Sequence, residues 1–169
     1  EELRLGYSRT EGSNGFNTGI EVPINARNTT LAFDYAQLEG QIVEEPLNDF
    51  DIRTDSQVYS LSLRHPLVRR ASESRIEEFA VGISADRIES ETTLAGFPFP
   101  LSPGADEDGS TRITELTLSQ EYLRQSRASA LLARSRFGLG IDAFNSTSGA
   151  EPNGQYFVWR GQALWLQGV

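Results

Sequence analysis

Hydrophobic and polar residues alternate along several stretches of this chain, most clearly over residues 134–144. Phe137, Leu139 and Ile141 occupy every second position. The positions between and around them hold glycine and charged residues: Arg134, Arg136, Gly138, Gly140 and Asp142. Successive side chains of a β-strand point to opposite faces of the sheet. The pattern therefore predicts a strand with one apolar face and one face of small and charged residues.

The same alternation predicts about eight strands along the chain. They cover residues 3–8, 19–24, 31–36, 59–64, 79–86, 116–122, 134–144 and 157–165. The predicted connections are long at 9–16, 39–56, 95–110 and 145–154, and short at 25–29, 68–75 and 124–129. In an up-and-down meander, alternate connections lie at the same end, as in outer-membrane barrels with long external loops and short periplasmic turns. The predicted fold class is all-β: one domain over residues 1–169, an antiparallel up-and-down transmembrane β-barrel.

The composition of the polar positions separates a membrane barrel from a soluble one. The polar face of a soluble sheet favours long or β-branched residues. Here Gly, Ala and Ser predominate, and small residues suit the interior of a narrow barrel. We therefore expect the apolar face to contact lipid. The residues predicted to do so are Leu61, Leu63, Val81, Ile83, Leu116, Leu118, Phe137, Leu139, Ile141, Trp159 and Trp165.

Charged residues on the polar positions balance in number. The predicted lumen network consists of Arg4, Glu21, Asp34, Arg64, Asp86, Glu121, Arg134, Arg136, Asp142 and Arg160. Because charges that leave water must be paired, five arginines and five carboxylates suit a neutral barrel interior. We expect this network to fill the lumen, with the first and last strands pairing to close the sheet.

Charge and composition narrow the function classes. The formal net charge of -9 argues against non-specific nucleic-acid binding. Cysteine is absent, which excludes disulfides and thiolate metal sites. All 15 basic residues are arginine, and the lack of lysine hints that much of the outer surface is not in water. No apolar run approaches the roughly 20 residues of a transmembrane helix, whereas barrel strands need only about 9–11.

Catalytic and metal-binding chemistry has no positive support in the sequence. His65 is the only histidine and lies beside Pro66, which favours an interfacial or turn-end role. The run Asp106-Glu107-Asp108-Gly109 lacks the spaced ligands of a calcium loop and is typical of solvated loop charge. We therefore predict no enzyme activity, no catalytic residue, no metal and no cofactor.

Several runs of the chain are similar in sequence to one family. The most specific is Gly96-Phe97-Pro98-Phe99-Pro100-Leu101-Ser102-Pro103-Gly104-Ala105-Asp106-Glu107-Asp108-Gly109, followed by Thr111-Arg112-Ile113. Weaker runs are residues 22–28, 62–67, 133–137 and 157–163. In collinear order they resemble the barrel region of bacterial haemolysin secretion/activation proteins, the outer-membrane transporters of two-partner secretion, with a cyanobacterial flavour.

This resemblance implies an outer-membrane location, a lipid or detergent environment and a secreted polypeptide substrate in the parent transporter. Family members carry periplasmic POTRA domains and a sixteen-stranded barrel. This chain has no POTRA-like segment and about half the strands, so we expect a central barrel fragment, natural or engineered. We further expect a monomer without secretion activity. Two alternatives stay open: two copies rebuilding a larger pore, and a soluble β-barrel or sandwich that binds through loops 39–56 and 95–110.

Overall fold

The computed structural model describes residues 1–169 except 103, 144–145, 148–154 and 169. Within the described residues the chain forms eight long strands, one two-residue strand and one short 3-10 helix. These are β1 (Glu2–Arg9), β2 (Ser13–Pro23), β3 (Thr30–Gln41), η1 (Asn48–Phe50), β4 (Ile52–Ser72), β5 (Arg75–Leu94), β6 (Phe97–Pro98), β7 (Ser110–Ser126), β8 (Ser129–Ile141) and β9 (Tyr156–Gln167). None of the described helices is long and apolar enough to cross a membrane.

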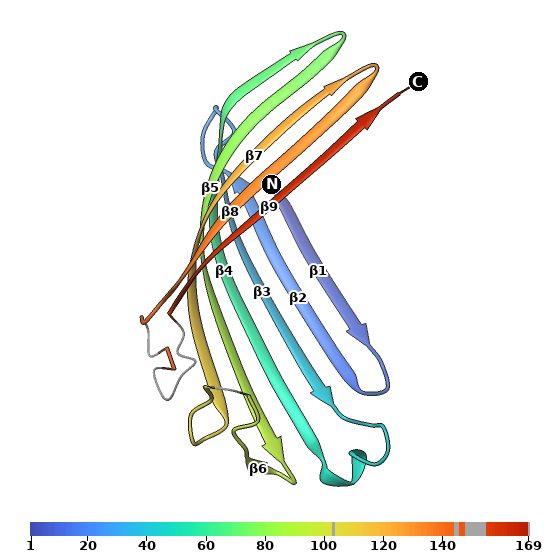
Figure 1. Ribbon diagram of the computed structural model, residues 1–169, viewed down its shortest axis with the longest axis vertical. Coiled ribbons are helices and arrows are strands. Elements are labelled where there is room, and N and C mark those ends of the chain that lie inside the picture. Colours follow the sequence, from blue (N-terminus) through green and yellow to red (C-terminus); the bar gives the residue numbers. More distant parts are fainter. Residues whose placement is uncertain (103, 144–145, 148–154, 169) are drawn as a thin grey trace.

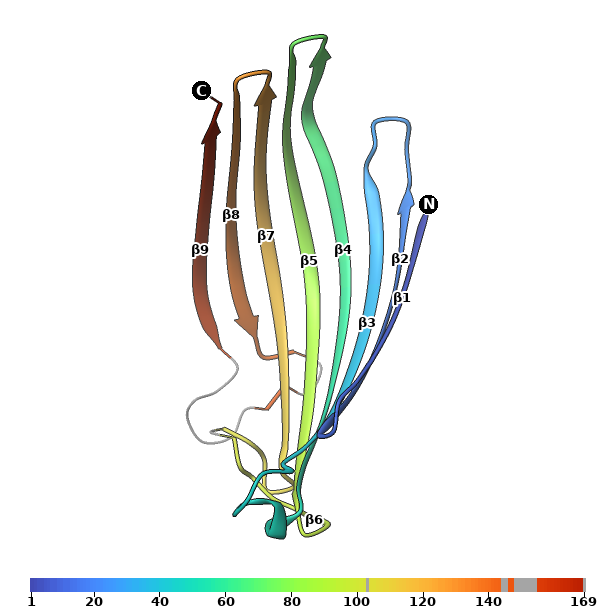
Figure 2. The same ribbon diagram turned by 90° about the vertical axis from the view of Figure 1, so that its right-hand side faces the viewer.

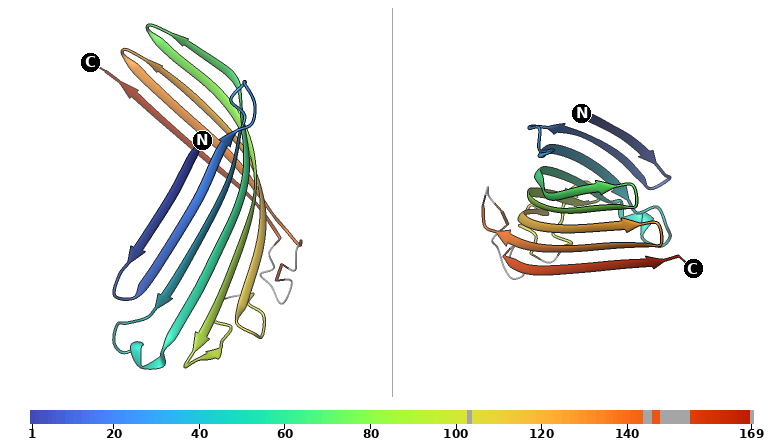
Figure 3. Two further views of the ribbon diagram at one scale, coloured as in Figure 1. Left: turned by 180° about the vertical axis from the view of Figure 1, so that it is seen from behind. Right: turned by 90° about the horizontal axis from the view of Figure 1, so that it is seen from above.

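The strands form one antiparallel sheet in chain order, β1-β2-β3-β4-β5-β7-β8-β9, with β6 paired to β5 (Figure 2). This confirms the predicted up-and-down meander. The predicted pairing of the first and last strands is absent: β1 and β9 are the two edges of an open sheet. The sheet bends and twists strongly along its length (Figure 1; Figure 3).

The connections alternate between the two ends of the sheet (Figure 1). One end, called the short-turn end, holds 24–29, 73–74 and 127–128. The other, called the long-loop end, holds the short connection 10–12, the loop 42–51 and the described residues of 95–109 and 142–155. Three of the four predicted long connections are therefore long. The prediction for 9–16 is wrong, because Ser13 already begins β2 and leaves a connection of residues 10–12.

The strand register gives the sheet two faces of opposite character. One row of neighbouring residues runs across the face that we call the apolar face: Leu3, Ile20, Phe33, Leu61, Ala85, Leu116, Leu139 and Phe157. The adjacent row lies on the other face, called the polar face: Arg4, Gly19, Asp34, Ser60, Asp86, Glu115, Gly140 and Tyr156. Every strand except β6 contributes to both rows, so the division extends across the whole sheet.

Burial is inverted relative to a water-soluble protein. On the apolar face Leu61, Ile83 and Leu118 are about half exposed, at 52%, 54% and 48%. The only buried hydrophobic residues among those described are two alanines on the polar face, Ala32 and Ala80. A soluble sheet would bury its leucines, so the exposed apolar face favours the predicted contact with lipid, which stays a prediction.

The apolar face forms a band with two limits along the strands. We call the limit towards the long loops, at the bottom of Figure 1, the upper limit, and the limit towards the short turns the lower limit. On β5 its apolar residues end at Arg87 towards the long loops and at Glu77 towards the short turns. These ten steps measure about 33 Å along a strand, or about 25 Å of height for a strand inclined by about 40°. The apolar band of outer-membrane barrels has about that height. Tyrosines lie at both limits: Tyr59 donates to Gln57 at 2.9 Å, and Tyr122 donates to Glu77 at 2.9 Å.

Beyond the upper limit the two faces exchange character. The row on the apolar face side becomes polar, with neighbours Gln57, Glu89 and Arg112. The row on the polar face side becomes apolar, with neighbours Val58, Ile88 and Ile113. The strands therefore continue past the band with polar residues on the side that is apolar within it.

The band crosses the strands obliquely. One register row shows this. It is polar on β5 and β7, where it holds Glu89 and Arg112, but aromatic on β1 and β2, where it holds Tyr7 and Phe16. At the lower limit, Trp165 of β9 shares a row with charged residues of β7 and β5. The band thus shifts towards the short turns from β1 to β9, as expected for strands tilted by roughly 35–45° to a barrel axis.

The central strand β4 extends well beyond its predicted bounds. β4 starts at Ile52 and continues past Pro66 to Ser72, so the predicted long connection shortens to 42–51 and the turn 68–75 shortens to 73–74. The register shifts between Pro66 and Val68. A proline cannot donate to the ladder, and a bulge lets the strand continue past it.

Leu139→Arg tests the position of the band. Leu139 lies on the apolar face of β8 with 47% of its surface exposed. A charge on the lipid face near the bilayer midplane costs about 2–4 kcal/mol, so folding into lipid vesicles should be strongly impaired. Urea titration of the vesicle-bound chain measures the loss of folding free energy.

Gln57→Arg is the matched control, since Gln57 lies on the same side of the sheet but beyond the upper limit of the band. Near the interface the cost should be about 0–1 kcal/mol. Equal losses for the two variants would show that the band has been placed wrongly.

Candidate functional site

The polar face forms a groove that crosses five strands. Its volume is about 350 Å³, and it is lined by side chains of β4, β5, β7, β8 and β9. The floor consists of small residues such as Ser62, Ser84 and Thr117. The small side chains are needed, because an added Cβ at Gly138 would lie 2.9 Å from Glu115 Oε1 and 2.9 Å from Val158 Cγ1.

A chain of ion pairs occupies the part of the groove nearest the short turns. Arg64 Nη2 lies 2.6 Å from Glu78 Oε1, and Arg64 Nε lies 3.4 Å from Glu121 Oε2. The second oxygen of Glu121 lies 3.4 Å from Arg134 Nε, and Glu78 also contacts Arg69 at 3.4 Å. Each carboxylate therefore bridges two arginines, which joins β4, β5, β7 and β8 across the polar face.

A separate ion pair lies near the β1 edge. Arg4 Nη2 donates to Asp34 Oδ1 at 2.8 Å. Gly19 lies between these two residues in the register, and its missing side chain makes room for the pair. An added Cβ there would lie 2.2 Å from Asp34 Oδ1.

Hydroxyl groups bind the two central carboxylates. Ser60 and Ser84 donate to Asp86 at 2.5 and 2.8 Å. Glu115 accepts from Thr117 at 2.9 Å and also from the phenol of Tyr156. Neutral donors therefore stabilise these carboxylates, which leaves arginines available for other partners.

Two arginines on the polar face have no carboxylate partner among the described residues. Arg136 of β8 and Arg160 of β9 are register neighbours, and both line the groove. Within the described part of the chain, no carboxylate oxygen lies within 4.0 Å of either guanidinium.

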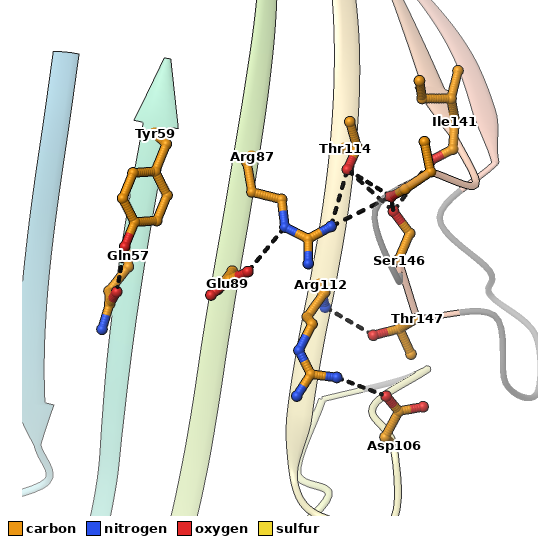
Figure 4. A network of polar contacts seen from close by, with 11 residues as sticks. Gln57, Tyr59, Arg87, Glu89, Asp106, Arg112, Thr114, Ile141, Ser146 and Thr147 are labelled. Carbon is orange, nitrogen blue, oxygen red and sulfur yellow. Dashed lines mark hydrogen bonds and ion pairs between the residues drawn. The ribbon is translucent and has the colours of Figure 1, made fainter. Parts of the chain in front are cut away.

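A second polar network lies at the upper limit of the band (Figure 4). Arg87 donates to Glu89 at 2.9 Å and to Thr114 at 3.1 Å. Ser146 is buried beside Thr114 and donates to its hydroxyl. The Thr147 amide donates to the Arg112 carbonyl at 2.9 Å, and the Arg112 amide donates to the Thr147 hydroxyl at 2.8 Å. These hydrogen bonds hold Ser146 and Thr147 against β7 at the long-loop end.

The acidic run at 106–109 has a structural role. Asp106 accepts from Arg112 at 3.5 Å, and Asp108 accepts from the hydroxyl and amide of Ser110 at 2.6 and 3.1 Å. The hydrogen bonds from Ser110 lower the pKa of Asp108, so this loop contact is lost only when the pH falls below the usual carboxyl range. The described residues include no group of three potential metal ligands.

The structure brings together only part of the predicted charge network. Arg4 pairs with Asp34, and Arg64 and Arg134 both pair with Glu121. Five predicted members are in no ion pair among the described residues: Glu21, Asp86, Arg136, Asp142 and Arg160. Asp142 follows the last residue of β8 and is exposed. Their role as a lumen lining stays a prediction.

Sequence reasoning missed three members of the groove region, namely Glu78, Glu115 and Tyr156. Each lies just outside a predicted strand bound but inside the observed strand. Period-two extension would have found them, since they precede Ala80, Thr117 and Val158 by two positions. His65 was expected at a turn or interface; it lies within β4, and its Nδ1 is 2.7 Å from Thr29 Oγ1 beside the β2–β3 turn.

The predicted lipid-contacting residues share the apolar face. Register rows join Leu63, Ile83, Leu118, Phe137 and Trp159. Trp159 and Trp165 are the most exposed of the predicted set, at 62% and 69%. The structure thus gives them one common face, and their contact with lipid stays a prediction.

Comparison with known proteins gives one informative likeness. No protein-family model and no curated protein sequence matches the chain. Among solved structures, CdiB from Escherichia coli superimposes with a TM-score of 0.64 at 17% sequence identity. The match covers 89% of this chain but only 27% of CdiB. At this identity the likeness shows the fold alone: the antiparallel meander of this chain superimposes on part of the CdiB chain.

Glu121→Gln tests the ion-pair chain, because it removes the charge shared by Arg64 and Arg134. We expect a loss of about 1–2 kcal/mol in unfolding free energy, discounted for partial exposure of the arginines. Urea unfolding in detergent or lipid measures it. Glu21→Gln is the matched control, because Glu21 makes no described ion pair. An equal loss for both variants would contradict the bridging role.

Gly138→Leu tests crowding on the polar face, because the new side chain would meet Glu115 and Val158. Overpacking should cost about 1–3 kcal/mol. Gly40→Leu introduces the same side chain into β3, where an added Cβ has its nearest neighbour at 4.0 Å. Unfolding titrations should rank Gly138→Leu well below Gly40→Leu, and the reverse order would contradict the crowding.

Proposed function

We propose that this chain forms part of the barrel wall of a bacterial outer-membrane transporter of the two-partner secretion type. The polar face lines the lumen, and an exported polypeptide moves past it. The observation that carries this proposal is the inverted sheet: every long strand has an exposed apolar side and a polar side, and the polar sides of five strands line the groove. The likeness to CdiB supports the same architecture.

The open edges of the sheet also favour a larger barrel. The backbone groups of β1 and β9 have no strand partner on their outer sides. In lipid such groups cost several kcal/mol each, so membrane sheets are closed. In the parent transporter, further strands supply the partners. In the isolated chain, β1 and β9 can close on each other, which would give a narrow barrel whose short-turn end is filled by the ion-pair chain.

The substrate class follows from the sequence resemblance. The run over residues 96–113 resembles haemolysin secretion/activation proteins, so we propose haemolysin- or adhesin-like polypeptides as the cargo of the parent. The same run forms β6 and the loop leading into β7 at the long-loop end. Because the chain spans 27% of the length of CdiB, export by the isolated chain is not proposed.

Detergent dependence separates this proposal from the soluble alternative, which uses the acidic loops as a binding edge. A membrane barrel should aggregate in plain buffer, fold in micelles and migrate heat-modifiably on a gel. A chain that is folded and monomeric in plain buffer, with equal migration before and after heating, would contradict the proposal. Mass measurement in detergent then separates a closed monomer from a pair of copies.

Planar-bilayer recording tests the filled lumen. We expect no large steady conductance from the isolated chain, because in a barrel closed on itself the chain of ion pairs would narrow the short-turn end of the lumen. A steady conductance of porin size from a preparation of proven monomers would contradict the filled lumen. Such a result would leave the membrane location intact.

A further inference from the structure

Arg136 and Arg160 place two like charges next to each other in the sheet. They are direct register neighbours on the polar face. Like charges placed opposite each other on adjacent strands destabilise a sheet. Because directly opposite residues have Cβ atoms about 4.5–5.5 Å apart, both long side chains can reach a single anion.

The carboxylates around this pair are already engaged. Asp86 accepts hydrogen bonds from Ser60 and Ser84, and Glu115 accepts from Thr117 and Tyr156. Glu121, the next carboxylate towards the short turns, bridges Arg64 and Arg134. The described polar face thus satisfies its acids with other groups and leaves two cations side by side.

The groove gives an anion access to both arginines. They line the same concavity of about 350 Å³, within the range of about 300–1,000 Å³ typical of ligand pockets. Both residues are exposed, so their charges are not buried by neighbours. The groove floor between the strands is made of serine, threonine and glycine, which leaves room for an extended backbone.

We propose that Arg136 and Arg160 form a binding site for the carboxylate group of an acidic polypeptide side chain. Two guanidinium forks can hold one carboxylate by charge-assisted hydrogen bonds, which relieves their mutual repulsion. This inference rests on the proposed function, since the polypeptide reaches the site through the lumen. It adds a preference for acidic segments at this point of the wall.

The test is binding of a fluorescent hexaglutamate peptide to the full chain in detergent micelles, followed by anisotropy. We expect binding that weakens with salt and falls at least about tenfold in the double variant Arg136→Gln/Arg160→Gln. The charge-retaining variant Arg136→Lys/Arg160→Lys should keep measurable binding. Unchanged affinity in the glutamine variant would overturn the proposal.

A matched control removes two arginines elsewhere. Arg53 and Arg112 are paired with aspartates at the long-loop end. Their double replacement by glutamine changes net charge equally and should leave peptide affinity within about twofold. Heat-modifiable migration of every variant confirms that each one folds. An equal loss in this control would reduce the effect to overall charge and overturn the site.

Two further probes identify the ligand. Hexalysine should not bind at the same concentration, and inorganic phosphate at matched anion charge should displace hexaglutamate only weakly. Full displacement by phosphate would assign the site to small free anions and overturn the polypeptide ligand. The two claims can fail separately. The peptide-binding experiment decides the arginine site, whereas the detergent dependence of the unchanged chain decides the proposed function.

Discussion

A sheet with leucine and tryptophan on one side and charges on the other must place its two faces in different surroundings. Here the usual arrangement is reversed, because the apolar side is exposed and the charged side is crowded. Leu61 is 52% exposed, while Ala80 on the opposite face is 1% exposed. In the proposed membrane setting, lipid rather than a protein core buries the apolar face. The charged face then needs its own partners, which the bridging carboxylates supply.

The same constraint links the ends of the strands to the two edges of the sheet. The apolar band ends at charged and tyrosine rows, and beyond it the faces exchange character. Its oblique course places Tyr7 of β1 and Trp165 of β9 at different levels of the register. Such a shift is needed when tilted strands continue into neighbouring strands. An open sheet in lipid is incomplete, so the proposed barrel wall needs further strands or closure on itself.

Sequence alternation predicted the strands best where they cross the apolar band, as at Phe137, Leu139 and Ile141. It failed where the faces exchange character: residues 52–56 were predicted as the end of the loop 39–56, because the positions on the apolar-face side there are polar. Pro66 suggested a strand end, although a bulge carries β4 past it. The partners of Glu121 depend on the register between strands that are distant in sequence. Alternation within one segment carries no information about that register. The same limit hid the juxtaposition of Arg136 with Arg160.

Spin labelling of alternate positions on β7 tests the assignment of the two faces most directly. The chain has no cysteine, so single cysteines at positions 116, 117, 118 and 119 can each carry one nitroxide in lipid vesicles. Labels replacing Leu116 and Leu118 should collide mainly with lipid-soluble oxygen. Labels replacing Thr117 and Ser119 should collide mainly with a water-soluble nickel chelate. The opposite pattern, or the absence of any alternation, would contradict a wall with its apolar face in lipid.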